Sequence, residues 1–299
     1  MIGMHTLKIT PSLLKQLCDL DQFKGLWQGL ERHTTGLHLL ADVADYGTGF
    51  EQLLAPLQGS PITGAQLCTL HAHLGKLSPP SAYKTRSSPL TIMKGNEAVG
   101  TLETALPEDV QGLMEKLLIW LESALQEEEW HPLLVLAVFS AVFLQIAPFE
   151  TGNIKLLHFL ILLVLLKKGY TYAPYVPLAP LFQAQAHAFW TALHENQRSL
   201  ETGSPAWEHW TGFFLGLLQV QKNSLLQKLY GQETALQNLP ALSAKIMGLF
   251  KQHQRLQMKQ IVSLTNGRRA TLKLRLAELV DAGYLRRYGQ ARATWYSLV

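Results

Sequence analysis

The segment IAPFETGNIK, residues 146–155, decides the fold of this chain. We predict a loop that leads into an apolar helix over residues 154–166. Gly152 permits a tight turn, and the N–H groups that open the helix point at whatever lies in front of them. A loop of this kind normally holds a phosphate, and the residues placed to contact it are Gly152, Asn153, Ile154 and Lys155. The alternative is a helix cap without a ligand.

The same segment resembles the signature loop of Fic (Fido-fold) proteins, which reads roughly HPFx[DE]GNGRxxR. The residues that match this pattern are Pro148, Phe149, Gly152 and Asn153. Those that differ are Ala147 for the family's histidine, Thr151 for its acid, Ile154 for its second glycine, and Lys155 and His158 for its arginines. The resemblance extends in consistent order over residues 76–230.

These departures remove the residues that would carry the family's chemistry. The resemblance implies that the histidine is the general base for a target hydroxyl, and Ala147 cannot accept a proton. It implies that the acid holds magnesium on a nucleotide, and the neutral hydroxyl of Thr151 is a poor ligand for a hard cation. We therefore predict no catalytic residue, no metal, and at most a weakly held nucleotide or phosphate without firm magnesium. The alternative is a protein adenylyltransferase with a divergent site, which moves AMP from ATP to a target hydroxyl.

A short β-hairpin is predicted upstream of this loop. Leu90, Thr91, Ile92 and Met93 form an apolar strand that ends at a Gly-Asn turn, residues 95–96. The hairpin resembles the flap that lies over the Fic site and docks a target segment by strand addition. The resemblance therefore implies a protein partner at these four residues.

Residues 1–75 are predicted to be helical, because leucines recur at three- and four-residue steps. Fic relatives with a helix before the core carry an inhibitory motif, [ST]xxxE[GN], whose glutamate pairs with a signature arginine. The counterpart here is DVADYG, residues 42–47, in which Gly47 is kept and Tyr46 replaces the glutamate. The alternative is an ordinary helix end at Gly47. Further along, His131 is expected to cap the helix that runs into the signature loop.

The composition is that of a chain with a substantial buried core. Of 299 residues, 47% are hydrophobic and 16% are charged, unlike a disordered chain. The N-terminus lacks the charged start and long apolar core of a signal peptide. The longest apolar run, residues 156–166, is interrupted by His158 and is too short to span a bilayer. We therefore expect a cytoplasmic protein without a membrane partner.

The net charge of +4 is unevenly distributed along the chain. Residues 241–299 hold eleven Lys and Arg against two acidic residues, a net charge of +9. The other 240 residues hold 15 Lys and Arg against 20 acidic residues, a net charge of −5. An acidic body with a basic C-terminal module indicates a polyanionic partner for the module.

This module resembles a winged helix-turn-helix. Helices are predicted over residues 242–251, 258–264 and 268–282, followed by two strands around a Gly-Gln turn. The side chains expected to contact double-stranded DNA are Arg268, Arg269, Lys273 and Arg275 on the third helix and Arg286, Arg287 and Arg292 on the wing. Other uses of such a module are dimerisation, packing on the Fic body, and binding of an acidic protein. A homodimer would suit a palindromic DNA site.

Together these patterns predict a mainly α fold, with a Fic-like helical core, a small β-hairpin flap and a C-terminal winged-helix domain. The predicted division is an N-terminal helical segment (1–75), the core (76–230), a linker (231–240) and the C-terminal domain (241–299). Our interpretation is a catalytically degenerate DNA-binding regulator, in which the Fic core senses a ligand or a protein.

Overall fold

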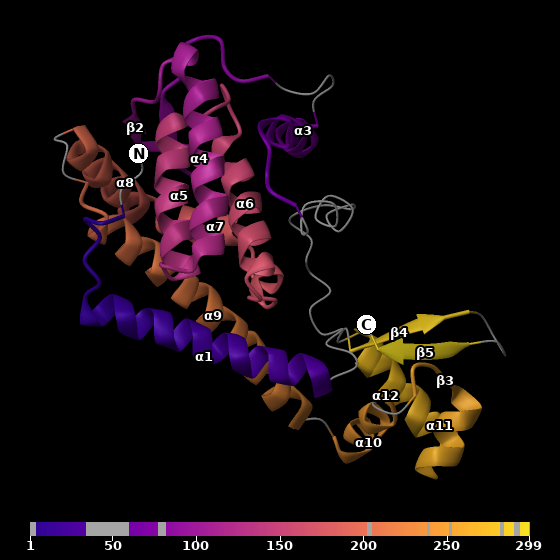
Figure 1. Ribbon diagram of the computed structural model, residues 1–299. Coiled ribbons are helices and arrows are strands. Elements are labelled where there is room, and N and C mark those ends of the chain that lie inside the picture. The colour runs from indigo at the N-terminus through magenta and orange to yellow at the C-terminus, as the bar shows by residue number, and fades with distance from the viewer. Residues whose placement is uncertain are drawn as a thin grey trace. The chain divides into compact units, whose positions relative to one another are not determined.

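The computed structural model describes residues 4–33, 60–76, 82–201, 205–237, 240–250, 253–281, 284–289 and 294–298. This part of the chain is mainly helical, with a two-stranded and a three-stranded antiparallel sheet (Figure 1). The chain divides into two compact units, one of Met1–Arg32 with Val43–Ser224 and one of His33–Asp42 with Leu225–Val299. The predicted inhibitory motif at residues 42–47 lies outside the described residues.

Two almost fully buried helices form the centre of the first unit. α5 (Pro132–Ile146) and α6 (Asn153–Lys167) are apolar around most of their circumference, which is the pattern of helices enclosed by other elements. α4 (Pro107–Glu127) runs beside them and buries a single face, with Val110, Met114 and Leu117 at helical spacing (Figure 1). None of the helices that the structure describes is long and apolar enough to cross a membrane.

The starts of these helices follow local sequence signals. Pro107 occupies the first turn of α4 with Glu108 and Asp109, whose charges suit the positive end of the helix dipole. α5 begins after His131, whose Nδ1 accepts a hydrogen bond from the Leu133 N–H at 3.2 Å. The predicted capping role of His131 is therefore confirmed.

α1 (Pro11–His33) packs against α9 (Glu208–Gln237), as Figure 1 shows. The buried ammonium of Lys222 on α9 bonds the Asp19 carboxylate on α1, and this hydrogen bond lowers the pKa of Asp19. Nearby, Gln219 Nε2 donates to the Gln16 carbonyl at 3.0 Å. α1, in the predicted N-terminal helical segment, belongs to the same compact unit as the core helices.

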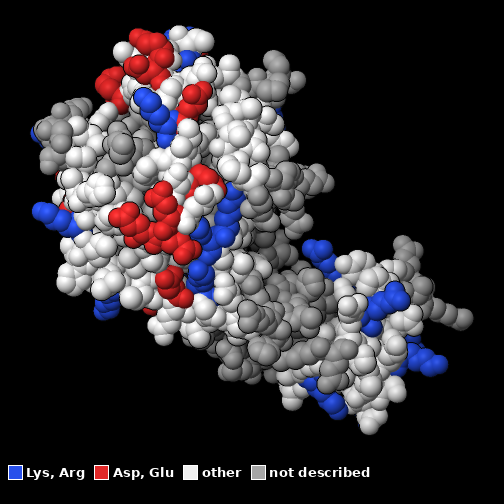
Figure 2. Space-filling model, viewed as in Figure 1, with Lys and Arg blue, Asp and Glu red and all other residues white. Residues whose placement is uncertain are grey.

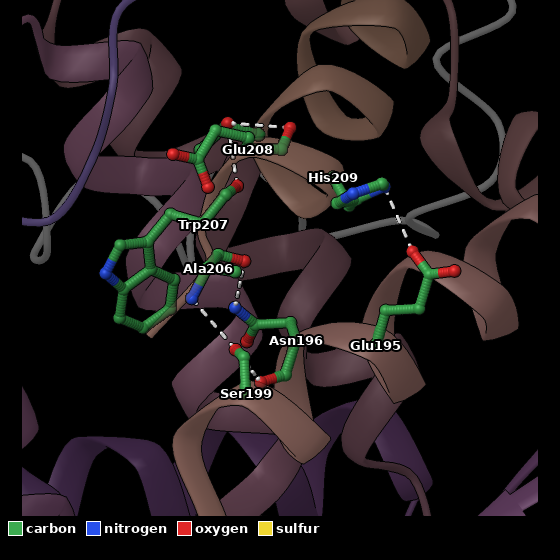
Figure 3. A network of polar contacts seen from close by, with 8 residues as sticks. Glu195, Asn196, Ser199, Ala206, Trp207, Glu208 and His209 are labelled. Carbon is green, nitrogen blue, oxygen red and sulfur yellow. Dashed lines mark hydrogen bonds and ion pairs between the residues drawn. The ribbon is translucent and has the colours of Figure 1, made fainter. Parts of the chain in front are cut away.

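A polar network joins α8 (Ala186–Glu201) to the start of α9 (Figure 3). Asn196, which is fully buried, donates through Nδ2 to the Ala206 carbonyl at 3.2 Å. The Ala206 N–H donates to Ser199 Oγ at 2.9 Å, and His209 Nδ1 lies 3.0 Å from Glu195 Oε2. These bonds fix the direction in which α9 leaves α8.

The predicted hairpin is present as β1 (Leu90–Lys94) and β2 (Glu97–Leu102), which pair antiparallel. Gly95 in its turn has a φ of 60°, a conformation that glycine adopts without strain. A Cβ on Gly100 would lie 2.0 Å from Trp190 Nε1, so only glycine fits where α8 approaches β2. The hairpin is therefore held against the helical core by a large side chain.

Two short helices follow α6 in the chain, η3 (Ala173–Tyr175) and α7 (Leu178–Ala184).

The second unit has its own apolar core. Its elements are α10 (Ala241–Phe250), β3 (Leu256–Gln257), α11 (Met258–Thr265), α12 (Arg269–Asp281), β4 (Leu285–Tyr288) and β5 (Trp295–Leu298), with the sheet order β3-β5-β4. The three helices begin and end within one residue of their predicted bounds, and β3 is an additional strand. Leu272, Leu276 and Leu279 of α12 are buried together with Ile246 and Ile261.

The predicted linker at residues 231–240 is largely helical, because α9 continues to Gln237. Gly231, Gln232 and Pro240 favoured a linker, but a single glycine in a helix lowers its stability by only about 1 kcal/mol. The preceding turns of α9 are anchored through Lys222 and Gln219. Most of this segment therefore extends α9, and the domain division at residues 231–240 stays a prediction.

Candidate functional site

The loop between α5 and α6 is a tight connection with a left-handed residue at each end. Ala147 ends α5 with a φ of 43°, and Gly152 precedes α6 with a φ of 80°. A positive φ costs a residue with a Cβ about 1–2 kcal/mol, so Ala147 is held there by its surroundings. Ala147 is only 1% exposed. The position at which the Fic pattern has its histidine is therefore packed into the protein.

Asn153 holds this loop in shape. Its side chain is buried, Oδ1 accepts a hydrogen bond from the Phe149 N–H at 3.0 Å, and Nδ2 donates to the Phe149 carbonyl at 2.7 Å. The side-chain amide of Asn153 is thus engaged on both sides with the backbone of Phe149. Its geometry is that of a clamp on the loop.

His71 of α3 (Gly64–Gly75) covers the same loop, and sequence analysis did not assign it to the site. Its ring stacks on Phe149, with centroids 3.8 Å apart and planes 1° from parallel. Its Nε2 lies 2.8 Å from the Thr151 carbonyl oxygen, and a Cβ on Gly152 would lie 2.8 Å from the same nitrogen. A signal was available, because His71 follows Leu70 on the buried face of an apolar helix.

Lys155 bonds the end of α3. Its Nζ donates to the Leu74 carbonyl at 2.7 Å. The last carbonyls of a helix lack partners within the helix, and a cation beside them is stabilising. Lys155, which was predicted to contact an anion, therefore caps the C-terminus of α3.

The segment before the hairpin braces the loop from outside. The Lys84 N–H donates to the Pro148 carbonyl at 2.9 Å, and Lys84 Nζ donates to the Ile146 carbonyl at 3.1 Å. Burial lowers the pKa of the Lys84 amine. Arg86 and Glu150 form an ion pair at 2.7 Å, so the one carboxylate on the loop faces a cation of the protein itself. Within the described residues, no group of three or more His, Cys, Asp or Glu could hold a metal ion.

A cavity of about 440 Å³ lies between the hairpin and the helices that face it. Its lining combines residues of β1 (Thr91, Ile92, Met93) and α6 (Ile154, Lys155, His158) with Leu74, Pro177, Ala179, Phe182, Gln183 and Phe189. The structure thus brings most of the predicted flap and two of the predicted anion-contacting residues to one space. Leu90, Gly152, Asn153 and Ala147 are not among the lining residues.

His158 is the most unusual polar residue of this cavity. Its Nε2 is buried and has no hydrogen-bond partner within the described part of the chain, and its ring centroid lies 4.7 Å from that of Phe182. Burial lowers the pKa of His158 to about 4. The imidazole is therefore neutral at physiological pH.

The basic side chains of the second unit face solvent. Arg268, Arg269, Lys273, Arg286 and Arg287 are exposed. Arg275 is paired with Glu278 at 2.7 Å, and Arg292 lies outside the described residues. In Figure 2 the described surface of this unit shows Lys and Arg without visible acidic side chains, whereas acidic groups gather on the first unit.

Comparisons with known proteins find one family model and similar solved structures. The family model described as Fic/DOC matches residues 61–165. The crystal structure of a Fic family protein from Desulfovibrio desulfuricans G20 superposes with a TM-score of 0.53 at 16% identity, covering 98% of this chain and 97% of that chain. A Fic domain containing signaling protein from Bacteroides thetaiotaomicron VPI-5482 gives a TM-score of 0.48 at 16% identity, covering 76% of this chain and 94% of that one. No curated protein matches the chain.

The matched range begins at residue 61, before the predicted start of the core at residue 76, and includes α3 and His71. The Desulfovibrio structure shares the fold, and the family match covers the hairpin, α4, α5 and the signature loop. The chain is thus similar to the Fic/DOC family over residues 61–165, and it shares the fold of the Desulfovibrio Fic family protein.

Proposed function

We propose that this protein is a DNA-binding regulator whose Fic domain senses a ligand and does not transfer AMP. Transfer to a hydroxyl needs a group that removes the proton. The observation that carries the proposal is the buried, left-handed Ala147 at the position of the family's base. Among the described residues that line the cavity, His158 is the only imidazole, and a base with a pKa of about 4 is weak at neutral pH.

The contacts of the signature loop also support the loss of AMP transfer. Lys155 is engaged with Leu74, and Asn153 is engaged with Phe149. Thr151 offers a hydroxyl where the family has an acid, and Glu150 is paired with Arg86. A magnesium nucleotide would have to compete with these internal bonds for each group that it needs.

The C-terminal unit supports the DNA-binding part of the proposal. Its order of helix, strand, helix, helix, strand, strand is similar to that of a winged helix-turn-helix. In that arrangement α12 is the recognition helix, and Arg268 and Arg269 stand at its N-terminal end. Arg268 and Arg269 are exposed, and no carboxylate of the described residues forms an ion pair with them. Their charge is therefore available to bind phosphates.

A labelling experiment tests the loss of transfer. The full chain is incubated with magnesium and ATP labelled on the α-phosphate, and we expect no label on the chain. Glu150→Gln and Lys155→Met serve as comparison variants. Label that appears on the wild type and is lost in either variant would establish the alternative, an adenylyltransferase with a divergent site.

A binding experiment tests the DNA part independently. Fluorescence anisotropy with a duplex oligonucleotide of mixed sequence is measured over a series of salt concentrations. We expect the logarithm of the affinity to fall linearly with the logarithm of salt, with a slope of about −0.9 for each phosphate contact. Absence of binding at the lowest salt, or a slope near zero, would contradict DNA binding through a basic surface.

A further inference from the structure

We infer that the cavity between β1 and α6 binds a small, uncharged, mainly apolar molecule that carries one hydroxyl or amide group to pair with His158 Nε2. The inference deepens the proposed ligand-sensing role of the Fic domain and rests on it. It names a chemical class that differs from the nucleotides suggested by the signature loop.

The size and lining of the cavity define the apolar part of this molecule. A volume of about 440 Å³ lies within the range of roughly 300–1,000 Å³ for small-molecule sites. Ile92, Met93, Ile154, Phe182 and Phe189 supply aliphatic and aromatic walls. Ile154 stands where the Fic pattern has a glycine, so its branched side chain fills space beside the helix start with apolar surface.

The polar part is defined by one buried nitrogen. His158 has a residual exposure of 6%, and its Nε2 has no hydrogen-bond partner among the residues that the structure describes. A buried polar atom without a partner costs about 1–3 kcal/mol, and most such atoms in proteins are satisfied. His158 lines the cavity, so a ligand hydroxyl, which can donate and accept, would satisfy this nitrogen in either tautomer.

The charges around the cavity argue against an anionic ligand. Among the described residues that line it, Lys155 is the permanent cation, and its Nζ is bonded to the Leu74 carbonyl. His158 remains neutral because burial holds its pKa at about 4. A phosphate entering this apolar space would lose its hydration without gaining an unengaged positive charge.

The test uses two probes that differ by one hydroxyl, benzyl alcohol and toluene, with AMP and inorganic phosphate as anionic probes. Binding to the full-length protein is measured by ligand-observed NMR. We expect benzyl alcohol to bind about 2–10-fold more tightly than toluene, the usual net effect of one hydrogen bond. We expect both aromatic probes to bind more tightly than AMP or phosphate.

The variant His158→Phe keeps an aromatic ring and removes the nitrogen. We expect it to bind benzyl alcohol and toluene equally. Ala179→Trp, at an exposed position of the lining, is a second variant that leaves the buried core unchanged and should weaken both aromatic probes by filling the space. Circular dichroism verifies that each variant is folded.

Three outcomes would overturn the inference: no binding of either aromatic probe to the folded wild type, tighter binding of AMP or phosphate, or an unchanged alcohol preference in His158→Phe. Anisotropy with duplex DNA on the same preparation keeps the two proposals apart. Lost probe binding with intact DNA binding would refute only the ligand class, whereas lost DNA binding with intact probe binding would refute the regulator.

Discussion

The signature loop and the basic surface of the C-terminal unit both carry polar side chains. Those of the loop form hydrogen bonds within the protein, whereas those of the C-terminal unit are exposed to solvent. On the loop, Asn153 and Lys155 bond backbone groups of the same unit. On the C-terminal unit, Arg268, Arg269 and Lys273 are exposed to solvent. The difference teaches that a recognisable motif can persist because it shapes a loop, whereas these three basic side chains of the C-terminal unit are directed to solvent.

The strongest test of the inward-facing loop is Asn153→Ala. The substitution leaves the Phe149 N–H and carbonyl without partners in a buried site. Each unsatisfied buried group costs about 1–3 kcal/mol, so we expect the free energy of unfolding to fall by about 2–6 kcal/mol for the two groups. Urea denaturation followed by tryptophan fluorescence measures the loss.

Gln111→Ala is the matched control, because this side chain is exposed on α4 and its bond to Glu115 lies at the surface. A surface substitution of this kind changes stability by at most about 0.5 kcal/mol. If Asn153→Ala costs no more than this control, the amide is not a clamp. The hydrogen bonds of Asn153 would then not stabilise the signature loop, and the contrast with the C-terminal surface would not hold.

The outward-facing surface is tested by the double variant Arg268→Ala/Arg269→Ala. We expect its affinity for duplex DNA to be about 10–100-fold lower, because lost arginine contacts cost about 1–3 kcal/mol. The slope of affinity against salt should also become shallower. Anisotropy titrations at several salt concentrations give both quantities.

Lys8→Ala/Lys116→Ala removes the same charge from exposed positions of the first unit. We expect this control to bind DNA with nearly wild-type affinity. An equal loss in both double variants would mean that net charge, rather than the α12 surface, governs binding. The two regions would then not differ in the way proposed.

A change of pH separates buried from exposed basic groups. The pKa of His158 is lowered by burial from 6.5 to about 4, so its contribution to stability is complete above pH 6.5 and is lost as the pH falls toward 4. Between about pH 7.5 and about pH 5 the unfolded state gains a proton that the folded state does not, which lowers stability by about 2 kcal/mol.

His158→Phe removes this titration. We therefore expect the variant to lose about 2 kcal/mol less than the wild type over the same interval, as measured by urea denaturation at each pH. Equal losses would show that the imidazole reaches solvent in the folded state. The pKa of His158 in the folded protein would then lie close to its ordinary value.

The fold was predictable from the sequence to a large extent because its signals are local. The helix starts at Pro107 and His131, the glycine turn at Gly95 and the three helices of the C-terminal unit all follow from capping, turn and periodicity rules. The family match over residues 61–165 agrees with the predicted core, although it begins earlier.

The contacts of the site were not predictable in the same way, because they join residues far apart in the chain. His71 lies against Thr151 and Gly152, and Lys155 reaches Leu74. The sequence of a loop determines its own side chains and backbone groups. It does not determine which distant element forms hydrogen bonds with those groups. By contrast, the ion pair of Arg275 with Glu278 could be predicted from the sequence, because the two residues lie three positions apart on α12.

The smallest expected effect decides which role Lys155 has. Its bond to the Leu74 carbonyl is exposed, and a cation at a helix C-terminus contributes about 0.3–1 kcal/mol. Lys155→Met should therefore lower the unfolding free energy by that amount, and Lys155→Arg should recover most of it because the positive charge is kept. If Lys155 caps α3, millimolar phosphate or AMP stabilises the wild type no more than it stabilises Lys155→Met. If Lys155 instead serves an anion, the ligand shifts the wild-type unfolding curve and leaves that of Lys155→Met in place, because a bound ligand stabilises the folded state in proportion to its affinity. That second result would mean that the loop faces outward like the C-terminal surface, since only a side chain able to leave Leu74 can respond to an added anion.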